Sequence, residues 1–218
     1  MLPCYNEKAI LPFTIKALSS LMQKLKKSNM IAEDSFMLFV NDGSDDGTWD
    51  IIAQAHQQDS CICGLNLSRN VGHQKALLAG LNFVLEHCEM AISIDVDLQD
   101  DISVIEQMIA KYRDGSDIVY GVRRERKSDT WFKRNTALLF YTIMGKFGVN
   151  TIYNHADFRL MSSQAIAFLY EYKEQNLFLR GLVPLIGLQQ DVVYYDRKSR
   201  TAGESKYPLK KMLSLAMD

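Results

Sequence analysis

The sequence predicts an α/β fold in which a mostly parallel, Rossmann-like sheet carries helices on both faces. Short, continuously apolar runs typical of buried strands alternate with longer runs that have the apolar period of a helix. From residue 35 to residue 122 the order is β-α-β-α-β-α-β, which is typical of parallel strands joined by crossover helices. The chain has 218 residues, 47% of them hydrophobic and 23% charged, so it has the composition of a globular protein with a sizeable core.

Each expected element of the first half has its own pattern. A helix is predicted over residues 8–29, because apolar residues recur on one helical face and Pro12 lies near the start, where proline is tolerated. The run SFMLFV predicts a buried strand over residues 35–40. The elements expected after it are helix 48–58, strand 62–67, helix 74–86, strand 90–94, helix 102–112 and strand 118–122.

The second half is less regular. Helices are expected over residues 131–147 and 164–172, and short strands over residues 158–161 and 191–195. No repeat or low-complexity linker divides the sequence, so we expect one domain over residues 1–218, cut at both ends. No apolar run approaches the roughly 18 residues of a membrane span. The cysteine spacing is not that of a disulfide framework, which favours the cytoplasm.

Charge is distributed unevenly, although the net charge is only −1. Four carboxylates lie within residues 95–101, whereas residues 123–134 hold six Lys or Arg against two acids, and residues 197–211 are similarly basic. A fold that brings these segments to one rim would place an acidic hollow beside a basic lip.

Polar or glycine-rich segments follow four successive expected strands. In open α/β sheets, ligands bind outside the carboxyl ends of the strands, so these segments should meet at one rim. They are PCYNE (3–7), NDGSDDGT (41–48), SRNVGH (68–73) and DVDLQD (95–100).

The sharpest of these segments contains Asp95 and Asp97, two carboxylates that leave a buried strand. Such oxygen ligands suit Mg²⁺ or Mn²⁺, which complete their shells with phosphate oxygens and water. A diphosphate leaving group needs such an ion to neutralise its developing charge. The alternative is a set of solvated loop acids, with Asp100 or Asp101 acting as a helix N-cap. The position after a strand favours the metal.

Residues 42–48 have the chemistry of a turn, and two interpretations stay open for them. They form a strand-to-helix turn only, or Asp42 accepts a hydrogen bond from a base or ribose. The segment lacks the lysine of a phosphate-binding Walker loop and is not a dinucleotide fingerprint.

Taken together, these segments and two later ones make the chain resemble a known family. It is similar to inverting family-two glycosyltransferases of the GT-A fold, and among them to the polyprenyl-phosphate sugar synthases, relatives of dolichol-phosphate mannose synthase and bactoprenol glucosyltransferase. The segments span nearly the whole chain: PCYNE (3–7), NDGSDDGT (41–48), LSRNxGHQKA (67–76), DVDLQD (95–100), DFRLM (157–161) and RxAGESKY (200–207).

The resemblance implies transfer of a hexose from a UDP- or GDP-sugar to a polyprenyl phosphate at the cytoplasmic face of the inner membrane, with Mg²⁺ or Mn²⁺ as cofactor. Residues 1–122 would bind the nucleotide sugar and residues 123–218 the acceptor. A nucleic-acid partner is not expected, and the oligomeric state stays open. The strand that should precede Pro3 is expected to be essentially missing.

The resemblance also implies roles for single residues. The nucleoside pocket would be lined by Pro3, Tyr5, Glu7 and Asp42, and the metal would be held by Asp95, Asp97 and Gln99.

Asp157 would face the transferred sugar, either as a base or as an orienting group. A phosphate acceptor is already ionised, so we expect Asp157 to orient rather than deprotonate. The alternative is a solvated loop carboxylate. His73 is expected to be a loop residue near the site.

Basic residues suit a phosphate acceptor, because arginine binds phosphate bidentately. The alternative is a solvated or membrane-facing surface. The residues expected to bind the acceptor phosphate are Arg123, Arg134, Arg200 and Lys206.

Three other functions are weighed against this one. Transfer to a saccharide hydroxyl would need a true base at Asp157. A phosphohydrolase would use Asp95 as nucleophile, but that chemistry favours threonine where this chain has Gln99. A non-catalytic nucleotide-sugar-binding module is disfavoured by the intact metal ligands.

Overall fold

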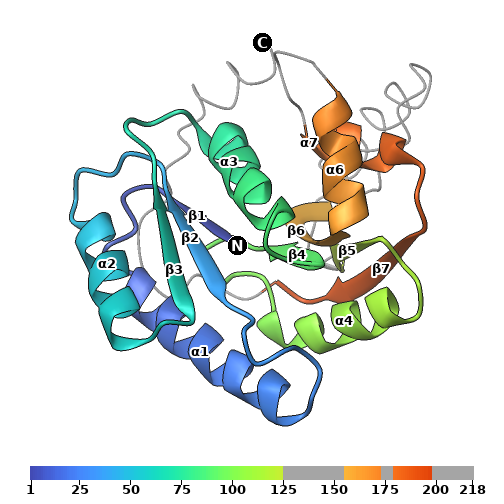
Figure 1. The fold of residues 1–218 in the computed structure, drawn as a ribbon, viewed down its shortest axis with the longest axis horizontal. Coiled ribbons are helices and arrows are strands. Elements are labelled where there is room, and N and C mark those ends of the chain that lie inside the picture. Colours follow the sequence, from blue (N-terminus) through green and yellow to red (C-terminus); the bar gives the residue numbers. More distant parts are fainter. Residues whose placement is uncertain (125–154, 173–178, 198–218) are drawn as a thin grey trace, which may run out of the picture.

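The computed structural model describes residues 1–124, 155–172 and 179–197. It has the predicted α/β architecture, with strands in a central layer and helices on both faces (Figure 1). The predicted helix over residues 131–147 lies outside the described residues.

The central layer contains two sheets. The first is parallel, with the order β1 (Leu2–Cys4), β2 (Met37–Asn41) and β3 (Ile62–Asn66). The second has the order β4 (Met90–Ser93), β6 (His155–Ser162), β5 (Ile118–Arg123) and β7 (Gln190–Tyr195).

The backbone of Met1 joins the two sheets. Its nitrogen donates to the oxygen of Ile92 at 2.7 Å, and its oxygen accepts from the nitrogen of Ile94 at 3.1 Å. The start of β1 therefore runs beside β4, and the N-terminus lies in the middle of the strand layer (Figure 1).

The second sheet is mixed, which the sequence pattern did not indicate. Strand β6 lies between β4 and β5 and is antiparallel to both, whereas β5 and β7 are parallel. Strands β4 and β5, which follow each other in the chain among the described strands, are therefore not neighbours in the sheet.

The expectation of a missing first strand is wrong. Strand β1 is short, but its residues pair with β2 from Leu2↔Phe39 to Cys4↔Asn41. Leu2 and Cys4 are buried, so core packing holds these few residues in the sheet. Pro3 therefore lies inside the strand, and the loop at the rim begins at Tyr5.

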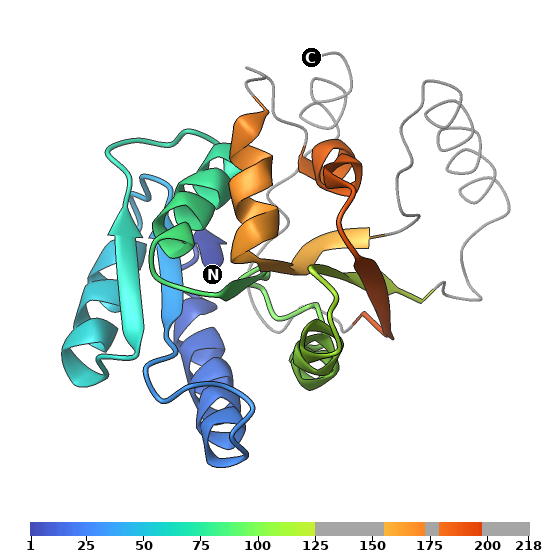
Figure 2. The same cartoon turned by 45° about the vertical axis from the view of Figure 1, so that its right-hand side comes forward.

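Each face of the strand layer is covered by its own set of helices (Figures 1 and 2). One face carries α1 (Leu11–Lys27), α2 (Thr48–Gln58) and α4 (Ile105–Arg113), which follows the 3₁₀ turn Ile102–Val104. The other face carries α3 (His73–Leu85), α6 (Ser163–Glu171), α7 (Leu179–Leu182) and the 3₁₀ turn Val183–Ile186.

Strand β2 shows why a hydrophobic core lies on each face of the strand layer. Its side chains alternate between the faces, with Met37 and Phe39 packing in one cluster and Leu38 and Val40 in the other. A strand buried on both sides is continuously apolar, which is the pattern that predicted it.

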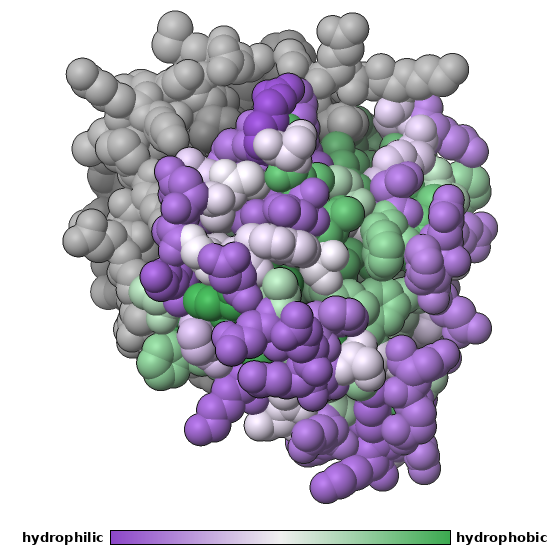
Figure 3. Space-filling view, turned by 60° about the vertical axis from the view of Figure 1, so that its left-hand side comes forward, coloured by the Kyte–Doolittle hydropathy of each residue, from purple (hydrophilic) through white to green (hydrophobic). Residues whose placement is uncertain are grey.

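The surface in Figure 3 is covered mainly by hydrophilic side chains, with apolar side chains in a smaller area between them. The large apolar residues that are exposed among the described ones come from separate segments: Tyr5, Phe13, Tyr170, Leu185 and Tyr194. No helix of the described residues is long and apolar enough to cross a membrane.

Candidate active site

The loops that follow β1 and β2 are fastened to each other at the carboxyl ends of the strands. The nitrogen of Asn6 donates to Ser44 Oγ at 3.0 Å, and the nitrogen of Asp45 donates to Asn6 Oδ1 at 3.0 Å. The nitrogen of Glu7 donates to Thr48 Oγ1 at 2.9 Å. The backbone of residues 6–8 is used in this way, and α1 begins at Leu11 rather than at the predicted residue 8.

Asp42 fastens the loop that follows β3. Its side chain is buried, and its Oδ1 and Oδ2 accept from the backbone nitrogens of Val71 at 2.7 Å and Gly72 at 3.0 Å. The carboxylate thus satisfies two backbone donors immediately before α3. Its predicted contact with a base or ribose stays a prediction.

Gly43 allows the same two loops to approach each other closely. Its φ is +63°, and a Cβ at this position would lie 2.4 Å from the carbonyl carbon of Arg69 and from the nitrogen of Asn70. Both the backbone conformation and the contact therefore require glycine.

The three predicted metal ligands, Asp95, Asp97 and Gln99, follow β4. Asp97 Oδ1 accepts from the nitrogen of Gln99 at 3.1 Å across a tight turn in which Leu98 has a φ of +54°. The side chain of Gln99 contacts Arg197. The side chain of Asp101 accepts from the nitrogen of Ser103, so the predicted N-cap role belongs to this residue.

The electrostatics of this corner suit a cation. Burial raises the pKa of Asp95 to about 6. His73 opposes this shift, whereas the negative charges of Asp157, Asp100 and Asp97 add to it. A cation beside Asp95 would relieve the repulsion between these carboxylates.

The donor set fits Mg²⁺ or Mn²⁺. Within the described residues, no group of three or more His, Cys, Asp or Glu is arranged to hold a metal by itself. Mg²⁺ commonly uses only one or two carboxylates and takes its other ligands from water and substrate phosphates. Asp95 and Asp97 supply oxygen donors of this kind.

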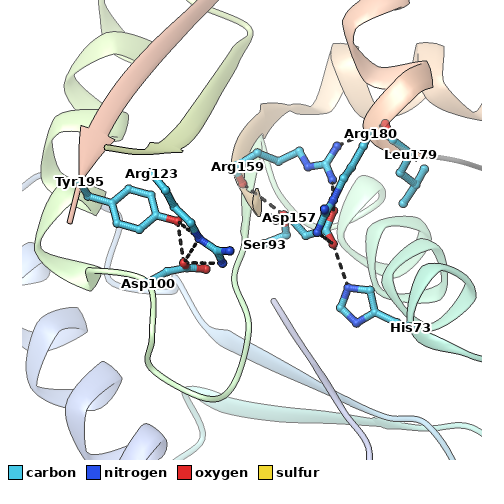
Figure 4. A network of polar contacts seen from close by, with 9 residues as sticks. All are labelled: His73, Ser93, Asp100, Arg123, Asp157, Arg159, Leu179, Arg180 and Tyr195. Atoms are coloured by element: carbon cyan, nitrogen blue, oxygen red, sulfur yellow. Dashed lines mark hydrogen bonds and ion pairs between the residues drawn. The ribbon is translucent and has the colours of Figure 1, made fainter. Parts of the chain in front are cut away.

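Asp157 is the centre of a cluster of charges (Figure 4). Its Oδ1 accepts from Arg159 Nη2 at 2.7 Å and from Arg180 Nε at 3.2 Å. Its Oδ2 lies 3.0 Å from Arg180 Nη2 and 3.2 Å from His73 Nε2. Asp157 is only 3% exposed, so the alternative that it is a solvated loop carboxylate is wrong.

Strand β6 brings Asp157 to the metal-binding corner. Its antiparallel register pairs Arg159 with Ser93. Continuing this register by two residues brings Asp157 toward Asp95. Ser93 Oγ also donates to the backbone oxygen of Asp157 at 2.6 Å. Insertion of β6 beside β4 therefore places Asp157 next to the carboxylates that follow β4.

The cluster keeps Asp157 ionised. Burial alone would raise the pKa of this carboxyl, but hydrogen bonds from His73 and Arg180 and the charge of Arg159 lower it far below its usual range. A carboxylate held so strongly in its charged form is a poor proton acceptor.

The same contacts act on His73. Burial lowers its pKa, but the hydrogen bond to Asp157 and the charge of Asp95 more than reverse this, so the pKa lies above 6.5. His73 is the first residue of α3, not a loop residue as expected, and it joins the first sheet's side of the site to Asp157.

Arg123 belongs to a second cluster, with Asp100 and Tyr195. Its Nη2 and Nε donate to Asp100 Oδ1 at 2.8 and 3.1 Å, and the hydroxyl of Tyr195 donates to the same oxygen at 2.6 Å. Asp100 is buried, so its charge is offset by this arginine. A contact between Arg123 and an acceptor phosphate stays a prediction.

The other predicted residues are placed as follows. Tyr5 is 40% exposed at the rim. The backbone oxygen of Glu7 accepts from the nitrogens of Ile10 and Leu11 at the start of α1. The remaining predicted phosphate ligands lie outside the described residues: Arg134, Arg200 and Lys206.

Comparison with known proteins places this arrangement in a family. The sequence model of Glycosyl transferase family 2 matches residues 1–169. The chain belongs to glycosyl transferase family 2.

Curated relatives of this family 2 chain match it over its whole length. YkoT of Bacillus subtilis (strain 168), an uncharacterized glycosyltransferase, is 54% identical over 218 residues, which is 100% of this chain and 65% of the relative. A bactoprenol glucosyl transferase of Shigella phage SfX is 36% identical over 219 residues, which is 100% of this chain and 69% of the relative. The chain therefore spans 65% to 69% of the length of these two relatives.

Solved structures support the GT-A fold of this family 2 chain. A glucosyl-3-phosphoglycerate synthase of Mycobacterium tuberculosis, crystallised with Mn²⁺, UDP-glucose and phosphoglyceric acid, matches with a TM-score of 0.54 and covers 99% of this chain and 74% of its own. A mannosyltransferase of Pyrobaculum calidifontis, in complex with GDP-mannose and Mn²⁺, has a TM-score of 0.56 and covers 92% and 56%. At 14% identity, both show the fold alone.

Sequence reasoning about this family 2 chain missed most of the Asp157 cluster. Arg159 lies in the DFRLM segment, but nothing in the segment indicates that its side chain turns back to Asp157. Arg180 lies outside every segment that carried the resemblance. Among these three partners of Asp157, only His73 was indicated by the sequence, because it is the last residue of the segment SRNVGH (68–73) that follows an expected strand.

Proposed function

We propose that the chain is the catalytic domain of an inverting, metal-dependent glycosyltransferase that moves a hexose from a UDP- or GDP-sugar to a polyprenyl phosphate. The observation that carries it is an Asp157 that two arginines and a histidine keep ionised, and whose charge acts on Asp95 together with that of Asp97. Family membership, and relatives named bactoprenol glucosyl transferase, support the activity and the acceptor class.

The donor belongs to the carboxyl ends of the first four strands. Pro3 in β1 and the loop residues Tyr5, Glu7 and Asp42 would line the nucleoside pocket. Asp95 and Asp97, with Gln99, would hold Mg²⁺ or Mn²⁺. When bound, the ion would neutralise the charge that develops on the leaving nucleoside diphosphate.

The lowered pKa of Asp157 bears on the class of acceptor. In the inverting reaction, a phosphate oxygen of the acceptor forms a bond to the anomeric carbon as the bond from that carbon to the donor diphosphate breaks. The acceptor phosphate is already ionised at neutral pH, so no side chain has to remove a proton. A buried carboxylate with a strongly lowered pKa is suited to orienting charges around this reaction rather than to acting as its base.

The two halves of the chain would divide the work. Residues 1–122 would bind the donor, and residues 123–218 would bind the acceptor through Arg123, Arg134, Arg200 and Lys206. A polyprenyl chain partitions into the bilayer, so we place the reaction at a membrane surface, on the cytoplasmic face.

One experiment tests the proposal directly. The protein is incubated with a panel of UDP- and GDP-sugars, Mn²⁺ and geranyl phosphate, a short soluble prenyl phosphate. We expect sugar transfer that EDTA abolishes. We expect Asp97→Asn to remove the metal-dependent part of UDP or GDP binding in calorimetry, because one of the proposed ligand charges is lost.

A matched control is Asp114→Asn, the same change at an exposed position after α4, which should behave as the wild type. Metal-dependent affinity unchanged in Asp97→Asn would remove the metal assignment. Transfer to saccharide hydroxyls, but not to geranyl phosphate, would establish the alternative acceptor class.

A further inference from the structure

The cluster around Asp157 carries more positive than negative charge. One carboxylate faces two guanidinium groups and an imidazole. The arginines are charged at any physiological pH, so these four side chains together carry a surplus of one positive charge even when His73 is neutral, and Asp95 is the neighbouring carboxyl whose charge acts on Arg180. Positive charge at a partly buried site favours the binding of an anion.

The two arginines differ in exposure, and this difference shows which of them a ligand anion can reach. Arg159 is 2% exposed, and its contacts with Asp157 and the backbone oxygen of Leu179 lie inside the protein. The side chain of Arg180 is 43% exposed, although it is also bound to Asp157. Arg159 therefore stabilises the buried side of the cluster, whereas part of the Arg180 side chain is accessible to a ligand.

Arg180 is held in a defined orientation. It reaches Asp157 from α7, and His73 approaches the same carboxylate from α3 on another side (Figure 4). Its Nε and Nη2 contact the two oxygens of Asp157, so the guanidinium plane is fixed. Within the described part of the chain, its Nη1 makes no protein hydrogen bond. An arginine fixed along one edge presents the other edge to a ligand.

We infer that Arg180 binds the phosphate group of the acceptor, and that Asp157, itself bound by Arg159, holds the Arg180 guanidinium in place for this purpose. The inference rests on the proposed function and adds a phosphate ligand to it. Asp157 would then be a positioning residue, because it acts through the arginine rather than on the sugar.

Two arguments favour the acceptor over the donor as the source of this phosphate. The donor diphosphate would have its charge offset by the ion at Asp95 and Asp97, whereas the acceptor phosphate would have no ion of its own. Arg180 also comes from the second half of the chain, yet its charge interacts with that of Asp95. It therefore lies beside the metal-binding corner, where the acceptor must meet the sugar.

The test compares Arg180→Gln with Arg180→Lys in the full chain. With geranyl phosphate as acceptor, we expect Arg180→Gln to lower kcat/KM by about ten- to a hundredfold, mainly through KM. We expect Arg180→Lys to recover part of this loss, because it keeps the charge but not the planar fork. Calorimetry should show weaker binding of geranyl phosphate to Arg180→Gln and unchanged binding of UDP or GDP with Mn²⁺.

Two controls make the result specific. Arg113→Gln is the same change at the end of α4, where the arginine contacts the backbone oxygens of Asn29 and Met30, and it should leave KM unchanged. Geraniol, which lacks the phosphate, should bind the wild type and Arg180→Gln equally. Thermal unfolding of each variant shows whether it is folded.

Three results would overturn the inference. If nucleotide binding weakens in Arg180→Gln while geranyl phosphate binding does not, Arg180 serves the donor. If only kcat falls and acceptor affinity is intact, Arg180 acts on Asp157 alone. If the wild type does not bind geranyl phosphate, there is no such site. Binding that depends on Arg180 without any sugar transfer would instead refute the proposed function and retain the phosphate site.

Discussion

The two sides of the candidate site are built from different interactions. On the side of β1 to β3, loops are fastened by hydrogen bonds between backbone groups and short side chains, such as those of Asp42 and Ser44. On the side of β6, Asp157 is held by Arg159, Arg180 and His73, which come from three different elements. The first side depends on local turns, whereas the second depends on buried charges that must all be present.

This difference predicts how each side responds to mutation. An ordinary hydrogen bond contributes about 1 kcal/mol net to stability, and a loop with several of them tolerates the loss of one. Removing one member of a buried ion pair leaves an uncompensated charge and costs about 3–5 kcal/mol. The Asp157 side should therefore be the more sensitive of the two.

The largest effect is expected for Asp157→Asn. The change leaves the fully buried Arg159 without its counter-charge, so we expect the free energy of unfolding at pH 7 to fall by about 3–5 kcal/mol. Denaturant unfolding measures this, with Asp114→Asn as the control. A variant that loses activity but keeps wild-type stability would contradict the charge-anchoring role and favour a general base.

A smaller effect is expected for Gly43→Ala on the other side. The new Cβ would meet the backbone of Arg69 and Asn70, so the loop must move in addition to bearing the cost of a positive φ. We expect a loss of about 1–3 kcal/mol in unfolding free energy and weaker nucleotide binding.

Gly187→Ala separates the two causes of that loss. Gly187 also has a positive φ, of +78°, but a Cβ there would come no closer than 3.9 Å to its nearest neighbour. It should therefore bear the backbone cost alone. Equal losses in the two variants, measured by denaturant unfolding, would show that close loop approach is not important at Gly43.

The smallest effect concerns the pH dependence of the contact that joins the two sides. The pKa of His73 is raised above 6.5 in the folded protein by Asp157 and Asp95, against the effects of burial and Arg180. Stability from protonated His73 is therefore complete below pH 6.5 and is lost as the pH rises through the folded pKa.

Comparison of the wild type with His73→Gln measures this contribution. The difference in Tm should be larger at pH 5.5 than at pH 9, and it should correspond to no more than about 1 kcal/mol. A difference that grows with pH would contradict the raised pKa of His73.

The sequence by itself determined the order of the helices and strands from β2 to β5 and the four segments at the strand ends. The predicted strand over residues 35–40 is β2 (Met37–Asn41), and the predicted helix over residues 48–58 is α2 (Thr48–Gln58). These predictions succeeded because apolar periodicity and turn chemistry are local properties of the chain. The same locality explains why Asp95 and Asp97 could be found as a pair at the end of a strand.

Only the tertiary structure decided what surrounds Asp157. Strand β6 enters the sheet antiparallel between β4 and β5, and this pairing joins residues more than 60 positions apart, such as Ser93 and Arg159. His73 and Arg180 then reach the same carboxylate from helices distant in sequence. No local pattern encodes such contacts, because the sequence neighbours of an arginine or histidine do not indicate whether its side chain will contact water or a distant carboxylate. The partner is selected when the sheet assembles and the buried charges have to be neutralised.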